Sequence, residues 1–530
     1  MEVPSPRSLT PRLSAWLERL GDRANPMLVR CVRQELRSRA FIGSFSVLLL
    51  VSVIAACIAA WVSMTAIGSS SEKTGRGLFG VLACAWSCAV VVIQGMNTFR
   101  AVSQERNDDT WDLVDLTGMG PRRILRGLMH ANLVQGILFT APIAPFLVMA
   151  YMLRGLDLLT IVFALVIVPF GAVAASSMAV MTASLSQQKA SRAALGGVLG
   201  MVLIGFWLTS FNFWFIGLDS LDQFLTELRR GNGEVWIFTA LMLDIWLVGV
   251  VFMLVLSGSL LSHPAANRST GPRVMAAVVW VNALLWVAGW IMWRLATGGS
   301  EYQLRECAEF SGAFTLCSLW WVCLVSVFTV TEDHELSPRQ ARSITSARGW
   351  RRVAMAAFGP GSSRGRLWFL AFSALSILLG LAGLAATSSE LMAPVLGAWF
   401  SLCYFAILVV VTDALYRGPF RAVFDTPAMR RVCLVLSLLV WGLVPMLLGL
   451  FLDSSNAPNE TFSNSIACMV SPFTGAYTLA TANGDHPIAT VTVSLVGIAA
   501  LVLLGYQGTR LALVTRRVTA DNAGRPTHVR

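Results

Sequence analysis

FIGSFSVLLLVSVIAACIAAWV, residues 41–62, is the stretch that decides the fold, because it contains no charged side chain. The hydrocarbon core of a bilayer is about 30 Å thick, and a helix needs about 20 apolar residues to cross it. Hydrophobic residues make up 55% of the 530 positions and charged residues only 13%, far below the charge of a typical soluble domain. The stretch therefore predicts a membrane-spanning helix.

Apolar blocks of similar length recur along the chain, and they predict an all-α, polytopic integral membrane protein with about twelve transmembrane helices. A division into two sixfold halves is a hypothesis, since a long polar segment follows the second span of each half. The expected spans cover residues 41–67, 77–99, 133–153, 156–185, 194–218, 235–261, 274–297, 310–331, 367–388, 392–413, 432–452 and 488–509.

The basic residues indicate how the chain is oriented. Lys and Arg number 40 against 29 Asp and Glu, a formal net charge of +11. Most of them fall in alternate connections counted from the amino terminus, and positively charged connections stay in the cytoplasm. We therefore expect both termini to be cytoplasmic. Topology then accounts for the basic excess, so we expect no nucleic-acid partner.

The choice of arginine over lysine indicates a bacterial source, and the first forty residues indicate which membrane holds the protein. Apart from Lys73 and Lys189, the basic residues are arginines, a bias typical of GC-rich bacterial genomes. The first forty residues lack the apolar core of a removable signal peptide. We therefore expect a multi-pass protein of the bacterial inner membrane, with the lipid bilayer as its surroundings.

Spans and polar connections divide the chain into six parts. The expected parts are a cytoplasmic amphipathic segment (1–40), a first transmembrane half (41–261) with a long cytoplasmic segment (100–132), the seventh and eighth transmembrane helices (262–331), a basic cytoplasmic segment (332–366), the last four transmembrane helices (367–509) and a cytoplasmic tail (510–530).

Motifs for catalysis are missing from the sequence. ATP hydrolysis by a P-loop needs GxxxxGK followed by Ser or Thr, and the nearest match, GSSSEKT at residues 68–74, has Glu72 where a glycine must approach phosphate. The sequence contains neither HExxH nor GxSxG, and its five histidines lie near membrane edges or in loops. We expect a protein that is not an enzyme and that carries no cofactor or metal.

Asp244 is the clear ionisable residue deep within an expected span. A carboxylate at mid-membrane costs roughly 3 kcal/mol on insertion scales, so it raises a functional question. Asp244 could line a substrate path or bind an ion, as in an ion-coupled secondary transporter. The alternative is a protonated or hydrogen-bonded aspartate that faces neighbouring polar side chains.

Two polar segments carry a resemblance to a known family. Residues 25–41, NPMLVRCVRQELRSRAF, form a basic amphipathic stretch, and SQERNDDTWDLVDLTGMGPRRILRG follows two spans later at residues 103–127. In this order they resemble permease subunits of ATP-binding-cassette (ABC) transporters of the type-two exporter class. In that family an interfacial helix precedes the first span, and a coupling helix follows the second. The residues that match the coupling pattern are Glu105, Arg106, Thr110, Leu113, Leu116, Thr117 and Gly127.

The resemblance implies a transport function and a partner. A separate ABC ATPase subunit would hydrolyse ATP and would dock on residues 103–127, through Glu105, Arg106 and the apolar face of Leu113 and Leu116. A homo-oligomer remains open, as do the substrate and the direction of transport. Two alternatives also remain open, the ion-coupled secondary transporter and a membrane scaffold or assembly protein that transports nothing.

Overall fold

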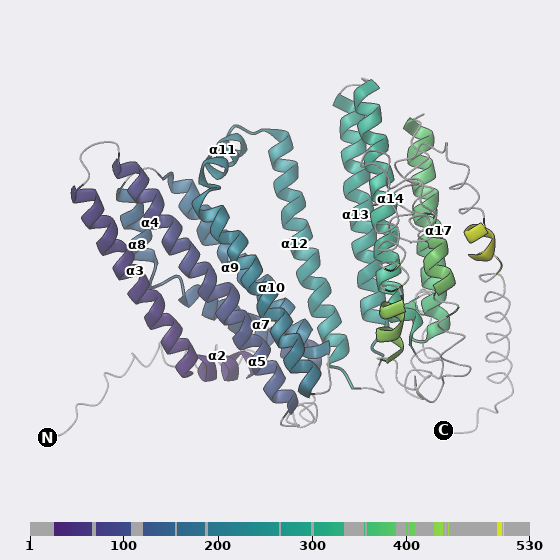
Figure 1. Cartoon of the computed structure of the whole chain (residues 1–530), viewed down its shortest axis with the longest axis horizontal. Coiled ribbons are helices and arrows are strands. Elements are labelled where there is room, and N and C mark those ends of the chain that lie inside the picture. The colour runs from purple at the N-terminus through teal and green to yellow at the C-terminus, as the bar shows by residue number, and fades with distance from the viewer. Residues whose placement is uncertain are drawn as a thin grey trace, which may run out of the picture. The chain divides into compact units, whose positions relative to one another are not determined.

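The computed structural model describes residues 26–65, 70–107, 120–153, 156–185, 189–263, 267–297, 301–332 and 358–387, with short pieces between 355 and 502. These residues are mostly helical and contain no strand, so the described part of the chain is all-α (Figure 1). Contacts divide the chain into unit 1, Met1–His263, and unit 2, Pro264–Arg530. The helices of unit 1 are α2 (Pro26–Leu36), α3 (Arg39–Thr65), α4 (Ser70–Ser87), the π-helix η1 (Cys88–Ile93), α5 (Gln94–Asn107), α7 (Pro121–Leu138), α8 (Ala144–Met152), α9 (Leu158–Leu185), α10 (Lys189–Phe215), α11 (Leu218–Arg229) and α12 (Gly233–Leu260).

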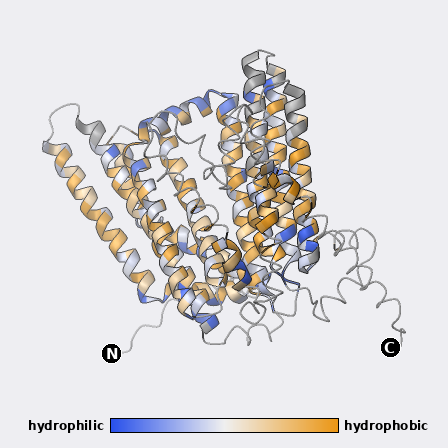
Figure 2. Ribbon diagram, turned by 45° about the vertical axis from the view of Figure 1, so that its right-hand side comes forward, coloured by the Kyte–Doolittle hydropathy of each residue, from blue (hydrophilic) through white to orange (hydrophobic). Residues whose placement is uncertain are grey.

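Unit 2 contains three long described helices, namely α13 (Thr270–Thr297), α14 (Glu301–Val330) and α17 (Ser362–Thr387). Across the described part of both units, seven helices are long and apolar enough to cross a membrane. Figure 2 shows hydrophobic residues along the lengths of these helices and hydrophilic residues gathered near their ends. The chain is therefore a multi-pass membrane protein, while the expected count of about twelve spans stays a prediction.

Helix α3 illustrates why the fold requires a lipid environment. Its buried residues form one narrow stripe that includes Phe41, Leu48 and Ala56, whereas Ile42 and Ile58 are more than half exposed. A soluble monomer rarely exposes so much contiguous apolar surface. The helix begins after Ser38, whose Oγ accepts a hydrogen bond from the backbone N–H of Phe41 at 3.1 Å, as an N-cap serine does.

The third expected span, 133–153, is not one continuous helix, because it is interrupted near Pro142 and Pro145. Helix α7 already begins at Pro121 and ends at Leu138, turns occupy residues 139–143, and α8 starts at Ala144. Pro142 has no N–H to continue the ladder of α7, and Pro145 occupies the first turn of α8, where a proline is tolerated.

A single long helical run through α4, η1 and α5 forms the centre of unit 1. It packs against α3, α8, α9 and α10, and its side chains Phe79, Leu82 and Val90 are fully buried. This run therefore connects the two ends of unit 1 through its packed core. We call the end at which α5 ends and α7 begins the α2 end, and the opposite one the α11 end (Figure 1).

At the α11 end, an amphipathic helix that the sequence reasoning did not anticipate joins α10 to α12. Leu218, Leu221 and Leu225 form the buried face of α11. Arg76 of α4 forms ion pairs with Asp219 and, at 3.0 Å, with Asp222 of α11. These ion pairs hold α11 against the first half of α4.

Candidate functional site

The α2 end of unit 1 brings together the two segments that carry the sequence resemblance. Helix α2 packs along α7, and Met27 of α2 is almost fully buried. An apolar cluster that includes Phe99, Val102, Leu125 and Leu128 fills the space between the ends of α5, α7, α9 and α10. The ends of these helices are thus packed together around one apolar cluster.

Glu105 and Arg30 join these two segments directly. The Oε1 atom of Glu105, near the end of α5, lies 3.2 Å from Nη2 of Arg30 on α2, and the side chains are 24% and 50% exposed. Exposed pairs of this kind contribute about 0.2–1 kcal/mol. The pair therefore positions Glu105 at the surface without being essential to the fold.

Arg106 turns toward the protein rather than away from it. Its Nη1 donates to the backbone oxygen of Ser184 at 2.9 Å and to that of Ala183 at 3.4 Å. These are carbonyls in the last turn of α9, which have no partner within the helix. A cation at a helix C-terminus is also favoured by the helix dipole. Arg106 therefore ties α5 to α9.

Arg192 is a structural residue of this end that the sequence reasoning missed. It lies in the first turn of α10, is only 4% exposed, and donates from Nη1 to the backbone oxygen of Ser103 at 3.0 Å. Nearby, Phe99 lies so close to Gly196 that a Cβ on this glycine would come within 2.7 Å of the ring. In the sequence, Arg192 looked like an ordinary basic residue flanking a span.

The remaining predicted coupling residues divide into two groups. Gly127 is buried in α7, on the face that also carries Leu125 and Leu128, whereas Arg122 and Arg126 on the opposite face are exposed. Four others fall in residues 108–119, outside the described part of the chain, and they are Thr110, Leu113, Leu116 and Thr117.

Asp244 lies apart from the α2 end. It is half-buried on α12, and Leu260, the last residue of this helix, is about 24 Å further along the helix axis. Two residues on, the Nε1 atom of Trp246 donates to the backbone oxygen of Phe170 at 3.0 Å, which holds α12 against α9. The structure does not bring Asp244 together with Glu105 or Arg106.

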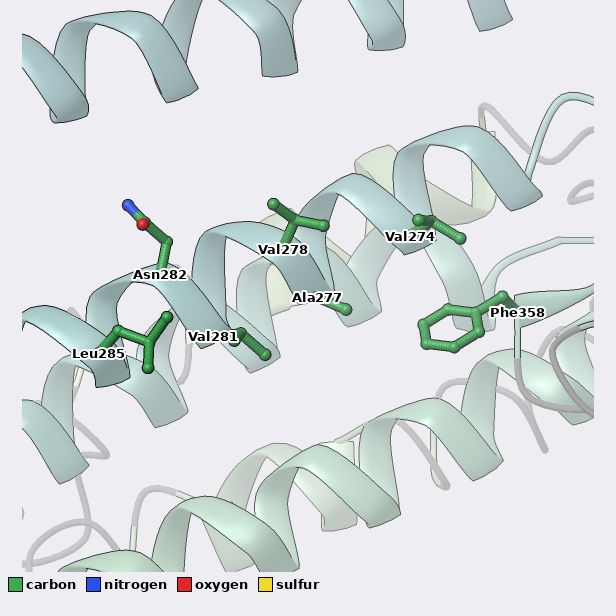
Figure 3. Close-up of a pocket in the computed structure, with 7 residues that line it drawn as sticks. All are labelled: Val274, Ala277, Val278, Val281, Asn282, Leu285 and Phe358. Carbon is green, nitrogen blue, oxygen red and sulfur yellow. The ribbon is translucent and has the colours of Figure 1, made fainter.

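Other kinds of site are scarce within the described residues. No group of three or more His, Cys, Asp or Glu residues there could hold a metal ion. A groove in unit 2 runs along α13 from Leu285 past Val278 to Val274, and Phe358 lies beside its Val274 end (Figure 3). Asn282 is the polar side chain of its lining, so the groove offers apolar contact and little chemistry.

Unit 2 contains a buried arginine that the sequence reasoning also missed. Arg273 of α13 is 1% exposed and donates to the backbone oxygens of Thr329, Gly359 and Gly361. Its Nη2 lies 2.8 Å from Oε2 of Glu332, which also accepts the backbone N–H of Gly361 at 3.1 Å. With φ of 109°, Gly361 adopts a conformation that favours glycine.

No protein-family model, curated protein or solved structure matches this chain.

Proposed function

We propose that this chain is the membrane-spanning permease subunit of an ABC transporter of the type-two exporter class, driven by a separate ATPase subunit that docks at the α2 end of unit 1. The observation that carries the proposal is the ion pair between Arg30 and Glu105. It joins residues 25–41 to residues 103–127, the two segments on which the family resemblance rests.

The contacts of the α2 end support a role in coupling. Glu105 and Arg106 are near the end of the helical run through α4, η1 and α5, which begins at Ser70 and crosses the whole of unit 1. Arg106 and Arg192 bind this run to the ends of α9 and α10. Closure of a partner against residues 103–127 would therefore move several packed helices together instead of one loop.

The charge of this end suggests the chemistry of the partner surface. Arg122 and Arg126 are exposed on α7, and Arg30 is half-exposed beside Glu105. An ATPase that docks here would present acidic groups to these arginines, with a cation placed to meet Glu105. Charge complementarity of this kind speeds association and fixes its register.

The proposed orientation places the α2 end, and both termini, in the cytoplasm of a bacterial cell. Alkaline phosphatase is active only outside the cytoplasm, so fusions at Gly68 and at Asn232 should be active, and a fusion at the carboxyl terminus should be inactive. An active carboxyl-terminal fusion would contradict the cytoplasmic carboxyl terminus. Inactive fusions at Gly68 and Asn232 would put the docking site out of reach of ATP.

Co-purification tests the function. Tagged protein is extracted from its native membrane in mild detergent, its partner chains are identified by mass spectrometry, and ATPase activity is recorded. We expect a stoichiometric nucleotide-binding subunit that is lost in Glu105→Arg. Glu234→Arg is the matched control, because Glu234 is an exposed carboxylate in the first turn of α12, at the α11 end. An intact permease without an ATPase, or equal losses in both variants, would overturn the proposal.

A further inference from the structure

A cluster of polar side chains lies in the interior of unit 1, away from the α2 end. Gln94 begins α5, Asn132 and Gln135 lie on α7, and Ser176 lies on α9. We call these four residues the amide cluster. None is more than 4% exposed. Polar groups this deep within apolar helices are rare unless they are hydrogen-bonded.

Several atoms of the amide cluster have no hydrogen-bond partner within the described part of the chain. They are Oε1 of Gln94, both polar side-chain atoms of Asn132, Oε1 of Gln135 and Oγ of Ser176. Exchanging oxygen and nitrogen in the Asn132 amide would leave the same two atoms unpaired. A group of this kind buried without a partner is strongly unfavourable.

Contacts between the three helices place these atoms near one another. The Nε2 atom of Gln94 donates to the backbone oxygen of Asn132 at 2.5 Å, and a Cβ built on Gly136 would lie 3.5 Å from Oε1 of Gln94 and 3.9 Å from Cβ of Ala172. Asn132 and Ser176 each lie one turn nearer the α2 end than Gly136 and Ala172, respectively. Asn132 and Ser176 are therefore level with each other, and the hydrogen bond from Gln94 reaches the backbone of Asn132 at this level.

We propose that the amide cluster is a buried water site. Its free atoms include both a donor and several acceptors, so a cation would face the Asn132 NH2 group and an anion would face the carbonyl oxygens. Water donates and accepts at once, and a buried water usually makes two to four hydrogen bonds. The cluster itself carries no charge that would recruit an ion instead.

The π-helix η1 is part of the same arrangement. It ends at Ile93, and the backbone N–H of the next residue, Gln94, donates to the oxygen of Ala89, five residues before Gln94. A π-turn contains one more residue than an α-turn and so rotates the next part of the helix by about 100°. Gln94 faces α7 because of this rotation, and the water site depends on it.

The sign of a stability change tests the proposal in the full-length protein. Asn132→Leu replaces the amide by an apolar group of similar size. If the site holds water, the variant loses hydrogen bonds, and the apparent Tm should fall by about 2–4 °C. If the site is dry, the variant removes an unpaired amide, and the Tm should rise or stay unchanged, which overturns the proposal. Ser177→Ala is the control, because Ser177 Oγ already donates to the backbone oxygen of Ala174.

A structure of the unmodified protein, at a resolution that reveals ordered water, gives a second test that needs no variant. We expect density at about 2.7–3.2 Å from the Asn132 side chain and from Oε1 of Gln94. Direct pairing of these side chains without density between them would contradict the proposal. So would density surrounded only by oxygens at about 2.4 Å, since that distance indicates a cation.

Discussion

In each unit of this protein an arginine satisfies the carbonyls at the end of a long helix, but the two arginines work in different surroundings. Arg273 in unit 2 is almost closed off from solvent, and it pairs with Glu332. Arg106 in unit 1 is half-buried, and beside it the pair of Arg30 and Glu105 lies at the surface. A buried charge that loses its partner is costly, whereas an exposed pair can exchange partners freely.

The difference separates a region that stabilises the fold, around Arg273 in unit 2, from a surface that can bind a partner, at the α2 end of unit 1. Arg273 holds together the start of α13, the end of α14 and the turn before α17. At the α2 end of unit 1, an apolar cluster fills the space between the helices, and charged side chains lie on the surface. Stability effects should therefore be large in unit 2 and small at the surface of unit 1, and binding effects should show the reverse order.

Arg273→Ala should have the largest effect on stability. It removes several hydrogen bonds and leaves Glu332 without its cation, and breaking a buried pair in this way costs about 3–5 kcal/mol. We expect a severe loss of folded protein in the membrane and a much lower apparent Tm in detergent. An effect below about 1 kcal/mol, the range of an exposed pair, would mean that the two units do not differ in this respect.

Arg192→Ala should have an intermediate effect within unit 1. The guanidinium is buried, and the substitution removes its hydrogen bond to the backbone oxygen of Ser103. A hydrogen bond from a charged group contributes about 1.5–3 kcal/mol. Thermal unfolding in detergent measures the change. Lys189→Ala is the matched control, because Lys189 lies in the same turn of α10 and is exposed, so it should leave the Tm unchanged.

Arg76→Ala should have a smaller and more local effect at the α11 end. Asp219 and Asp222 lose their common cation, and a partly exposed network of this kind contributes about 1 kcal/mol. We expect faster amide hydrogen exchange over α11, Leu218–Arg229, and unchanged exchange in α3. Arg229→Ala, at the exposed end of the same helix, should not alter the exchange. A uniform increase across unit 1 would contradict a local role.

The sequence predicted the long helices well and the contacts between them poorly. The length of an apolar block fixes a span, so the expected 156–185 matches α9, Leu158–Leu185. Helix α11 was missed because its apolar residues recur at helical spacing over too short a length for a span. The π-turn at Cys88–Ile93 has no residue pattern of its own, because it depends on the packing of its neighbours.

The candidate site could be predicted in part. Motif order singled out Glu105 and Arg106, but which residues they contact depends on helices that come together only in the fold. Nothing in the sequence linked Glu105 to Arg30, or Arg192 to Ser103. Asp244 stood out because of its charge, whereas the neutral amide cluster drew no notice among apolar residues.

A charge-swap cycle at Arg30 and Glu105 tests the central claim most directly. The variants Arg30→Glu, Glu105→Arg and the double swap should each change stability by less than about 1 kcal/mol. For each variant, the folded fraction and the amount of co-purified ATPase are measured. We expect Glu105→Arg to abolish ATPase binding and the double swap, which restores the ion pair, not to rescue it, because the ATPase needs a carboxylate at position 105. Full rescue by the double swap, or normal binding in Glu105→Arg, would contradict docking through Glu105.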